Sequence, residues 1–102
     1  MDKTIQIDTF TRITRVSRET ITSLKKYEDI LTKTNKRQNL IGNSTINDIW
    51  TRHFLDSAQV IDFIDKNCKT LVDLGSGAGF PGLVLAIILK DRKIPLKIKL
   101  IE

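Results

Sequence analysis

Leu71-Val72-Asp73-Leu74-Gly75-Ser76-Gly77-Ala78-Gly79-Phe80-Pro81-Gly82 is a segment that predicts a short strand, a glycine-rich turn and the start of a helix. Its first residues form the apolar run typical of a parallel strand covered on both faces. The glycines that follow permit positive φ angles and let a ligand approach the backbone. The apolar residues 83–89 predict a helix, and residues 94–101 predict a second strand. Together they predict the first βαβ unit of a nucleotide-type binding fold.

The composition of the 102-residue chain is that of one small globular domain, with 40% apolar and 28% charged residues. The net charge of +5 is compatible with nucleic acid as an anionic partner, and equally with a charge that only keeps the protein in solution. With one histidine and one cysteine, Cys68, the chain has neither an internal disulfide nor the ligands for a zinc site, so no metal is expected.

The location of the protein is predicted from what the sequence lacks. Its amino end has no long apolar signal-peptide core. The longest apolar run, residues 83–89, is far shorter than the roughly 20 residues that a membrane span needs. We therefore expect a cytoplasmic protein without a membrane partner.

The part of the chain before the glycine-rich segment is predicted to be helical. Residues 1–15 fit a short helix or an extended lead-in. Ser17 is a predicted N-cap of a long amphipathic helix that ends in the polar run 35–39. A third helix is predicted to begin at residues 44–45 and to end near residues 65–67.

The glycine-rich turn permits two interpretations. Gly77-x-Gly79-x-x-Gly82 has the spacing of a dinucleotide-binding loop, although a lone match of this kind is weak evidence. The longer pattern Asp73-x-Gly75-x-Gly77-x-Gly79 places a carboxylate at the end of the strand. That carboxylate would repel a pyrophosphate and attract a ligand that carries an ammonium and a sulfonium group, such as S-adenosylmethionine.

A second carboxylate, Glu102, closes the second predicted strand and could accept hydrogen bonds from both ribose hydroxyls of a nucleoside. Structural alternatives stay open for each residue. Asp73 could cap nearby loop amides, Glu102 could be a simple terminal charge, and Phe80 could pack under the helix or line an adenosyl pocket.

Three motifs carry a resemblance to a known family: Asn35-Lys36-x-x-Asn39-Leu40, Trp50-x-Arg52-His53-x-x-Asp56-Ser57, and Asp73 to Gly82 as quoted above. In these residues the chain resembles the glucose-inhibited division protein B family, whose members methylate N7 of a guanine in small-subunit (16S) ribosomal RNA. The resemblance runs from about Val16 to Glu102. The glycine loop alone would indicate only a methyltransferase, and the other stretches make the match more specific.

The resemblance implies an α/β fold, with amino-terminal helices before the first βαβ unit of a Rossmann-like S-adenosylmethionine-dependent methyltransferase. It implies S-adenosylmethionine as cofactor and 16S ribosomal RNA as partner. The cofactor-binding residues that it implies are Asp73, Gly75, Gly77, Gly79, Phe80 and Glu102. Arg52, His53 and Asp56 would lie at the mouth of the site, where they could contact RNA.

Plainer accounts of the same residues also hold. Arg52 and Asp56 have the i, i+4 spacing of a weak surface ion pair. His53 falls on an apolar helix face, as a packed histidine would. Asn35 and Asn39 could cap and turn the chain. A solvated helix face would account for the basic residues at positions 25, 26, 33, 36 and 37.

No catalytic residue is assigned, because guanine N7 is nucleophilic while neutral. Methyl transfer to it is an in-line displacement, so positioning the two reactants can supply roughly 7–11 kcal/mol of the acceleration.

The complete family fold needs a larger sheet than the two strands predicted here. We expect residues 1–67 to form a helical segment and residues 68–102 an incomplete βαβ unit, truncated after the second strand. As an amino-terminal portion the chain would be marginally stable and inactive alone, and monomeric when complete. Two alternatives are a non-catalytic RNA-binding remnant and a fragment of a nicotinamide-dependent reductase. The position of Asp73 argues against the reductase.

Overall fold

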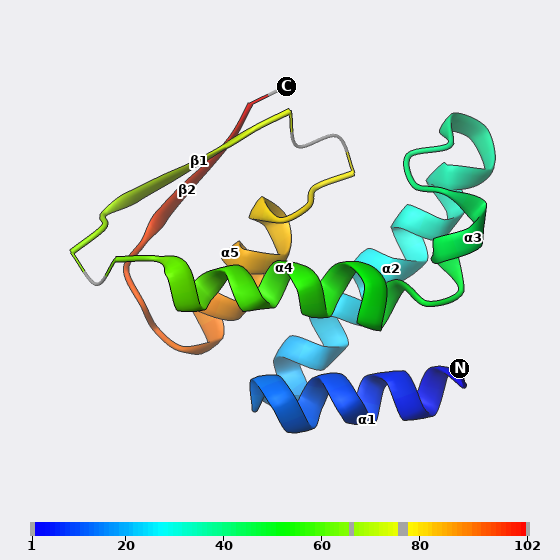
Figure 1. Ribbon diagram of the computed structural model, residues 1–102, viewed down its shortest axis with the longest axis horizontal. Helices are drawn as coiled ribbons and strands as arrows, with labels where there is room; N and C mark the ends of the chain where they lie inside the picture. The colour runs from blue at the N-terminus through cyan, green and yellow to red at the C-terminus, as the bar shows by residue number, and fades with distance from the viewer. Residues whose placement is uncertain (1, 66, 76–77, 102) are drawn as a thin grey trace.

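The computed structural model describes residues 2–65, 67–75 and 78–101 (Figure 1). Of the residues predicted to bind a cofactor, Gly77 and Glu102 lie outside this described part. The two strands lie at one side of the molecule in Figure 1, and helices fill the rest.

The first two helices begin at side-chain caps. Helix α1 (Lys3–Thr14) is capped by Asp2, whose carboxylate accepts a hydrogen bond from the Thr4 N–H, so the amino end is helical rather than extended. Helix α2 (Arg18–Gln38) has Ser17 as its N-cap, with Ser17 Oγ 3.2 Å from the Thr20 nitrogen. The predicted N-cap is confirmed.

The prediction of one continuous third helix is wrong. Helix α3 (Asn43–Ile46) is followed by a turn, a π-helical segment η1 (Trp50–Phe54), helix α4 (Leu55–Gln59) and a 3-10 segment η2 (Val60–Phe63). The break falls at Asn47 and Asp48, residue types whose short polar side chains compete with the helical backbone. The segment also ends earlier than predicted, because Ile64 is already extended.

The predicted βαβ unit is present. Strand β1 (Thr70–Leu74) and strand β2 (Lys97–Ile101) are parallel neighbours, with helix α5 (Gly82–Asp91) as the crossover. Parallel strands need such a connection. The expectation that β1 is covered on both faces is not met among the described residues. Val72 and Leu74 alternate with the half-buried Leu71 and Asp73, and they are 46% and 75% exposed.

One hydrophobic core joins the helices to this unit. Val84 and Ile88 of α5 belong to the same buried cluster as Phe10 of α1 and Trp50 of η1. The division of the chain at residue 67 stays a prediction, since the core extends across it.

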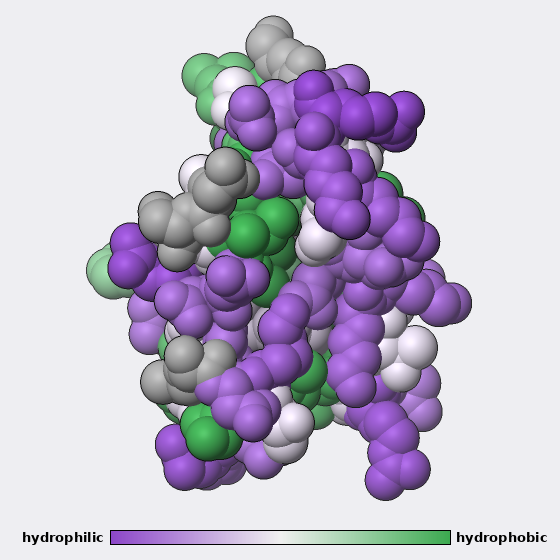
Figure 2. Space-filling view, turned by 90° about the vertical axis from the view of Figure 1, so that its right-hand side faces the viewer, coloured by the Kyte–Doolittle hydropathy of each residue, from purple (hydrophilic) through white to green (hydrophobic). Residues whose placement is uncertain are grey.

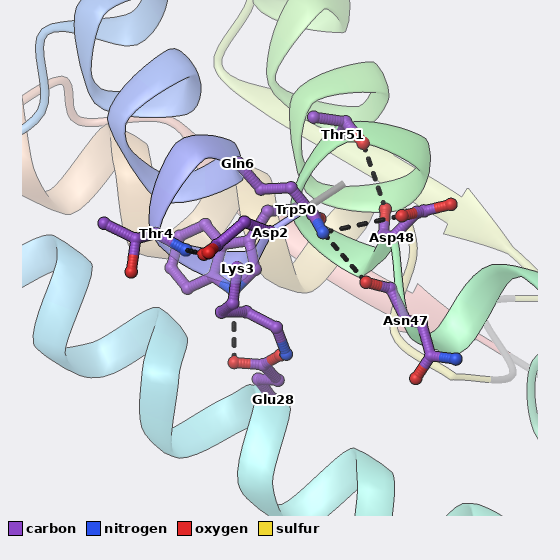
Figure 3. Close-up of polar contacts among 9 residues, drawn as sticks. All are labelled: Asp2, Lys3, Thr4, Gln6, Glu28, Asn47, Asp48, Trp50 and Thr51. Carbon is purple, nitrogen blue, oxygen red and sulfur yellow. Dashed lines mark hydrogen bonds and ion pairs between the residues drawn. The ribbon is translucent and has the colours of Figure 1, made fainter.

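Polar contacts fix α1 against this core (Figure 3). Glu28 of α2 accepts a hydrogen bond from Trp50 Nε1 at 3.1 Å, and its other carboxylate oxygen pairs with the Lys3 ammonium group. Buried Gln6 donates from Nε2 to the Asn47 carbonyl at 2.8 Å. Glu28 thus ties α2 to α1 and to η1, and Gln6 ties α1 to the turn before η1.

The side shown in Figure 2 is mostly hydrophilic, and apolar side chains are visible in a recess near its middle. Within the described residues, no helix combines the length and the apolar composition that a bilayer crossing requires.

Candidate functional site

The glycine loop connects the carboxyl end of β1 to the amino end of α5. Gly75 opens it with a φ of +70°, a backbone conformation that L side chains rarely adopt. A Cβ atom added at Gly75 would have no atom within 4 Å. Glycine therefore serves the backbone conformation at this position, and the space beside it is open to a ligand.

Asp73 is the next-to-last residue of β1, and its side chain points toward α5. Its Oδ2 accepts a hydrogen bond of 2.9 Å from the Gly82 N–H, one of the amides that a helix leaves unpaired at its amino end. This contact is the amide-capping alternative left open by the sequence. The described residues place no hydrogen bond on the second carboxylate oxygen, so the cofactor role of Asp73 stays a prediction.

Close packing explains the two later glycines of the loop. Gly79 is buried with a φ of +97°, and an added Cβ would lie 3.2 Å from Leu83 Cβ and 3.3 Å from Tyr27 Cζ. At Gly82, a Cβ would lie 2.8 Å from Asp73 Oδ2 and would overlap the Leu100 side chain. The start of α5 is thus seated directly on the sheet.

Phe80 joins the loop to the helical part of the molecule. Its ring stacks on the imidazole of His53, with ring centroids 4.9 Å apart and planes 8° apart. It also contacts Phe54 and Tyr27, at centroid distances of 5.9 and 5.8 Å. The half-buried Phe80 ring therefore packs against η1 and α2.

A hollow of about 230 Å³ lies between this loop and the helix that precedes β1. Its lining brings together the predicted site-mouth residues and the cofactor-loop residue Phe80: Arg52, His53, Asp56, Ser57, Val60, Phe80 and Pro81. Two sequence motifs, residues 50–57 and 73–82, thus form one surface.

His53 is held in this hollow by a ring stack and a polar contact. Its Nε2 lies 2.9 Å from Thr45 Oγ1, and the side chain is half-buried. Burial is the main cause that lowers its pKa below the ordinary value of 6.5, the Arg52 guanidinium lowers it further, and the Asp56 carboxylate opposes them. The packed-histidine alternative describes this geometry well.

The predicted ion pair between Arg52 and Asp56 is not formed in the described part of the chain. Both residues are exposed. At such positions a pair contributes only a few tenths of a kcal/mol, and water competes for both groups. The guanidinium and the carboxylate therefore remain accessible at the edge of the hollow.

Sequence reasoning missed Tyr27, which lies behind the loop. Its hydroxyl donates a hydrogen bond to the Ala78 carbonyl, and its ring stacks on Phe54 at 5.5 Å with planes 16° apart. Burial raises the pKa of Tyr27 to about 12. The available signal was a lone tyrosine on the apolar face of a helix, because a buried phenol hydroxyl usually has a partner.

The comparison with known families shows to which family the chain belongs. The GidB family, described as rRNA small subunit methyltransferase G, matches residues 20–102. The chain belongs to the GidB family.

Relatives in this family carry the name ribosomal RNA small subunit methyltransferase G. The protein of Parvibaculum lavamentivorans is 44% identical over 86% of this chain and 39% of its own length. The protein of Rhodospirillum centenum is 56% identical over 72% of this chain and 34% of its own length, and that of Jannaschia sp. is 49% identical over 86% and 42%. This GidB-family chain thus spans about two fifths of such relatives or less. No solved structure matches it.

The first of the three motifs is structural in this GidB-family chain. Asn35 is buried, and its Oδ1 accepts a hydrogen bond of 2.8 Å from the Ile41 N–H. Asn39 ends α2 in the left-handed conformation, with a φ of +48°. The capping alternative is confirmed for both residues.

The basic residues of α2 predicted to form a solvated face are all exposed: Lys25, Lys26, Lys33, Lys36 and Arg37. Lys33 pairs with Asp29 at 2.9 Å.

Proposed function

We propose that this chain forms the cofactor-loop part of a methyltransferase that transfers a methyl group from S-adenosylmethionine to N7 of a guanine in 16S ribosomal RNA. The observation that carries the proposal is the loop after β1, with Asp73 and Gly75 at the carboxyl edge of a parallel sheet in a chain of the GidB family. Ligands of open α/β sheets bind at that edge. The surrounding fold would be a partial Rossmann-like methyltransferase fold.

The residues of the loop suit a cationic nucleoside ligand. Gly75 leaves open space beside the backbone, and Asp73 places a carboxylate next to it. We assign the cofactor to Asp73, Gly75, Gly79 and Phe80, and also to Gly77 and Glu102 from their sequence positions. When bound, S-adenosylmethionine supplies an electrophilic methyl group on its sulfonium. Asp73 favours the positive charge of that ligand, and Gly75 and Gly79 permit the loop conformation.

The hollow beside Phe80 suits the RNA side of the reaction. The exposed guanidinium of Arg52 can contact a phosphate, and the rings of His53 and Phe80 offer surfaces on which a base can stack. We assign Arg52, His53 and Asp56 to this side. None of them needs to act as a general base, because guanine N7 carries a free lone pair and alignment supplies the acceleration.

The cofactor is tested by calorimetric titration with S-adenosylmethionine and, in parallel, with NADH. The informative variant is Asp73→Asn, which keeps an acceptor for the Gly82 N–H and removes the charge. Asp62→Asn, which removes an exposed carboxylate from η2, is the matched control. We expect S-adenosylmethionine to bind and Asp73→Asn to weaken it by about tenfold or more, the effect of losing a charged partner. Binding of NADH without binding of S-adenosylmethionine would contradict the proposal.

The RNA side is tested by binding to 16S ribosomal RNA at several salt concentrations. Arg52→Ala is expected to weaken RNA binding and to reduce the salt dependence, since one phosphate contact is lost. Arg18→Ala, at the exposed start of α2, is the control. Equal losses in both variants would show that the hollow has no special part in binding.

A further inference from the structure

We propose that Tyr27 is a positioning residue through which helix α2 holds residues 78–80 of the glycine loop in their conformation. Its effect on cofactor binding rests on the proposed function, whereas its effect on the loop does not. The contact bridges 51 positions of sequence, from the middle of a helix to the turn after β1.

The first observation is the hydrogen bond from the Tyr27 hydroxyl to the Ala78 carbonyl. A buried hydroxyl without a partner is costly, so the phenol favours the loop conformation that presents this carbonyl. The ring itself is fixed by its stack on Phe54 and its tilted contact with Phe80. A fixed ring gives the hydroxyl a fixed position.

The second observation is the shape of the loop at Gly79. A side chain at this position would meet the Tyr27 ring, because an added Cβ would lie 3.3 Å from Cζ. The backbone of the loop therefore rests on the phenol with no side chain between them. Gly79 and Tyr27 form a complementary pair, although they lie in different elements.

The third observation is how the loop is held elsewhere. Asp73 holds the start of α5 from within the βαβ unit through the Gly82 N–H. Tyr27 and the rings of His53 and Phe54 contact the loop from the helices. Of these three helix residues, Tyr27 is the one that makes a hydrogen bond to the loop backbone, so it has the most direct influence on backbone conformation from the helical side.

The test compares Tyr27→Phe with Thr20→Val in the whole chain. Tyr27→Phe removes the hydroxyl and keeps the ring contacts, so the fold is expected to survive. Thr20→Val removes another hydroxyl between α2 and α5, the one 2.6 Å from Asp91 Oδ1. Each variant loses one hydroxyl hydrogen bond that α2 makes, Tyr27→Phe the one to the loop and Thr20→Val the one to α5.

The first measurement is hydrogen exchange of the Gly82 and Leu83 amides, which are bonded to Asp73 Oδ2 and to the Gly79 carbonyl at 2.9 Å each. We expect exchange at these amides to accelerate roughly three- to tenfold in Tyr27→Phe, as for one lost hydrogen bond. In Thr20→Val, exchange at these two amides should change only as far as the global stability of that variant changes. Equal acceleration in both variants would overturn the proposal.

The second measurement is the affinity for S-adenosylmethionine, which we expect to fall by a similar factor in Tyr27→Phe and to be unchanged in Thr20→Val. If the unaltered chain binds no S-adenosylmethionine, the proposed function fails, and the exchange rates still decide the role of Tyr27. If exchange accelerates while affinity is unchanged, Tyr27 holds the loop, but its effect on cofactor binding is overturned.

Discussion

Tyr27 and Asp73 hold opposite sides of the glycine loop, each through one oxygen atom. The Tyr27 hydroxyl donates to the Ala78 carbonyl, and Asp73 Oδ2 accepts from the Gly82 N–H. The first contact needs a neutral phenol and the second an acceptor oxygen. The first condition is met at neutral pH, because burial raises the pKa of Tyr27 to about 12.

The ionisation of Tyr27 can be measured directly, because it is the only tyrosine in the chain. We expect the ultraviolet absorbance of tyrosinate to appear with a midpoint of about 12 in the folded protein and near 10 in denaturant. The unfolded chain ionises first, so the stability due to Tyr27 is complete below about pH 10 and is lost as the pH rises toward 12. Tyr27→Phe should lack this part of the loss. Equal midpoints in both states would contradict the burial.

Local spacing was enough to predict the places of Asp73 and Gly75, since a strand followed by glycines limits where a carboxylate and a positive φ can lie. It was not enough for Tyr27, whose partner is 51 residues away. The stack of His53 on Phe80 is likewise a property of the folded chain. Contacts of this kind depend on how helices are placed in space, which one sequence does not specify.

Helix α5 is fixed at both ends by polar or close contacts. At its amino end, Gly82 permits a close approach to Asp73 and Leu100. At its carboxyl end, the Asp91 carboxylate accepts hydrogen bonds from the Ser17 N–H and from Thr20 Oγ1, at 3.2 and 2.6 Å. The crossover helix is therefore tied both to the sheet and to the start of α2.

Gly82→Ala is expected to destabilise the chain by about 1–3 kcal/mol, the usual cost of overpacking, because the new methyl group would meet Asp73 and Leu100. Urea unfolding followed by the fluorescence of Trp50, the sole tryptophan, measures the change. Ala86→Gly, within the same helix, is the control for intrinsic helix propensity, at about 1 kcal/mol. An unchanged midpoint for Gly82→Ala would show that α5 can shift away from the sheet at little cost.

Asp91 should make the stability of the chain depend on pH in the acid range. Hydrogen bonds from Ser17 and Thr20 lower the pKa of its carboxyl below the ordinary value of 3.8. Its stabilising contribution is therefore present above that value and is lost as the pH falls through the lowered pKa. Asp91→Asn should cost about 1 kcal/mol at pH 7 and much less at the lowest pH at which the chain stays folded. A constant difference between the two proteins across this range would contradict the interpretation.

The ends of α2 illustrate which features of an element a sequence can predict. The capping roles of Ser17 and Asn39 could be predicted because capping depends on neighbouring residues. The π-helical turn at Trp50–Phe54 was not readable, since its two terminal aromatic residues are both fully buried against other elements. Tertiary packing there overrides the regular helical period.

At the scale of the whole molecule, the helices share one core with α5, while the outer face of the sheet stays uncovered. Val72, Leu74 and Ile101 are 46%, 75% and 47% exposed. They lie at positions of β1 and β2 that the register places side by side, since Leu74 pairs with Ile101. Apolar surface next to an unpaired strand edge favours association with other chains.

Leu74→Lys is expected to reduce concentration-dependent association in sedimentation velocity and to lower the binding of an apolar dye. The charge disrupts the apolar surface of the outer sheet face without entering the core. Ile30→Lys is the control, because Ile30 is 64% exposed and lies on α2, away from the sheet. If both variants reduce association equally, surface charge in general rather than the sheet face would be responsible.

The contact between the glycine loop and Tyr27 also affects whether such loops can be exchanged between proteins. A peptide of residues 70–101 contains both strands, the crossover helix and every glycine of the turn, yet it lacks the phenol on which Gly79 rests. Grafting this loop into another enzyme would consequently transfer its glycine spacing without its shape, unless a matching aromatic hydroxyl from a remote helix were transplanted with it.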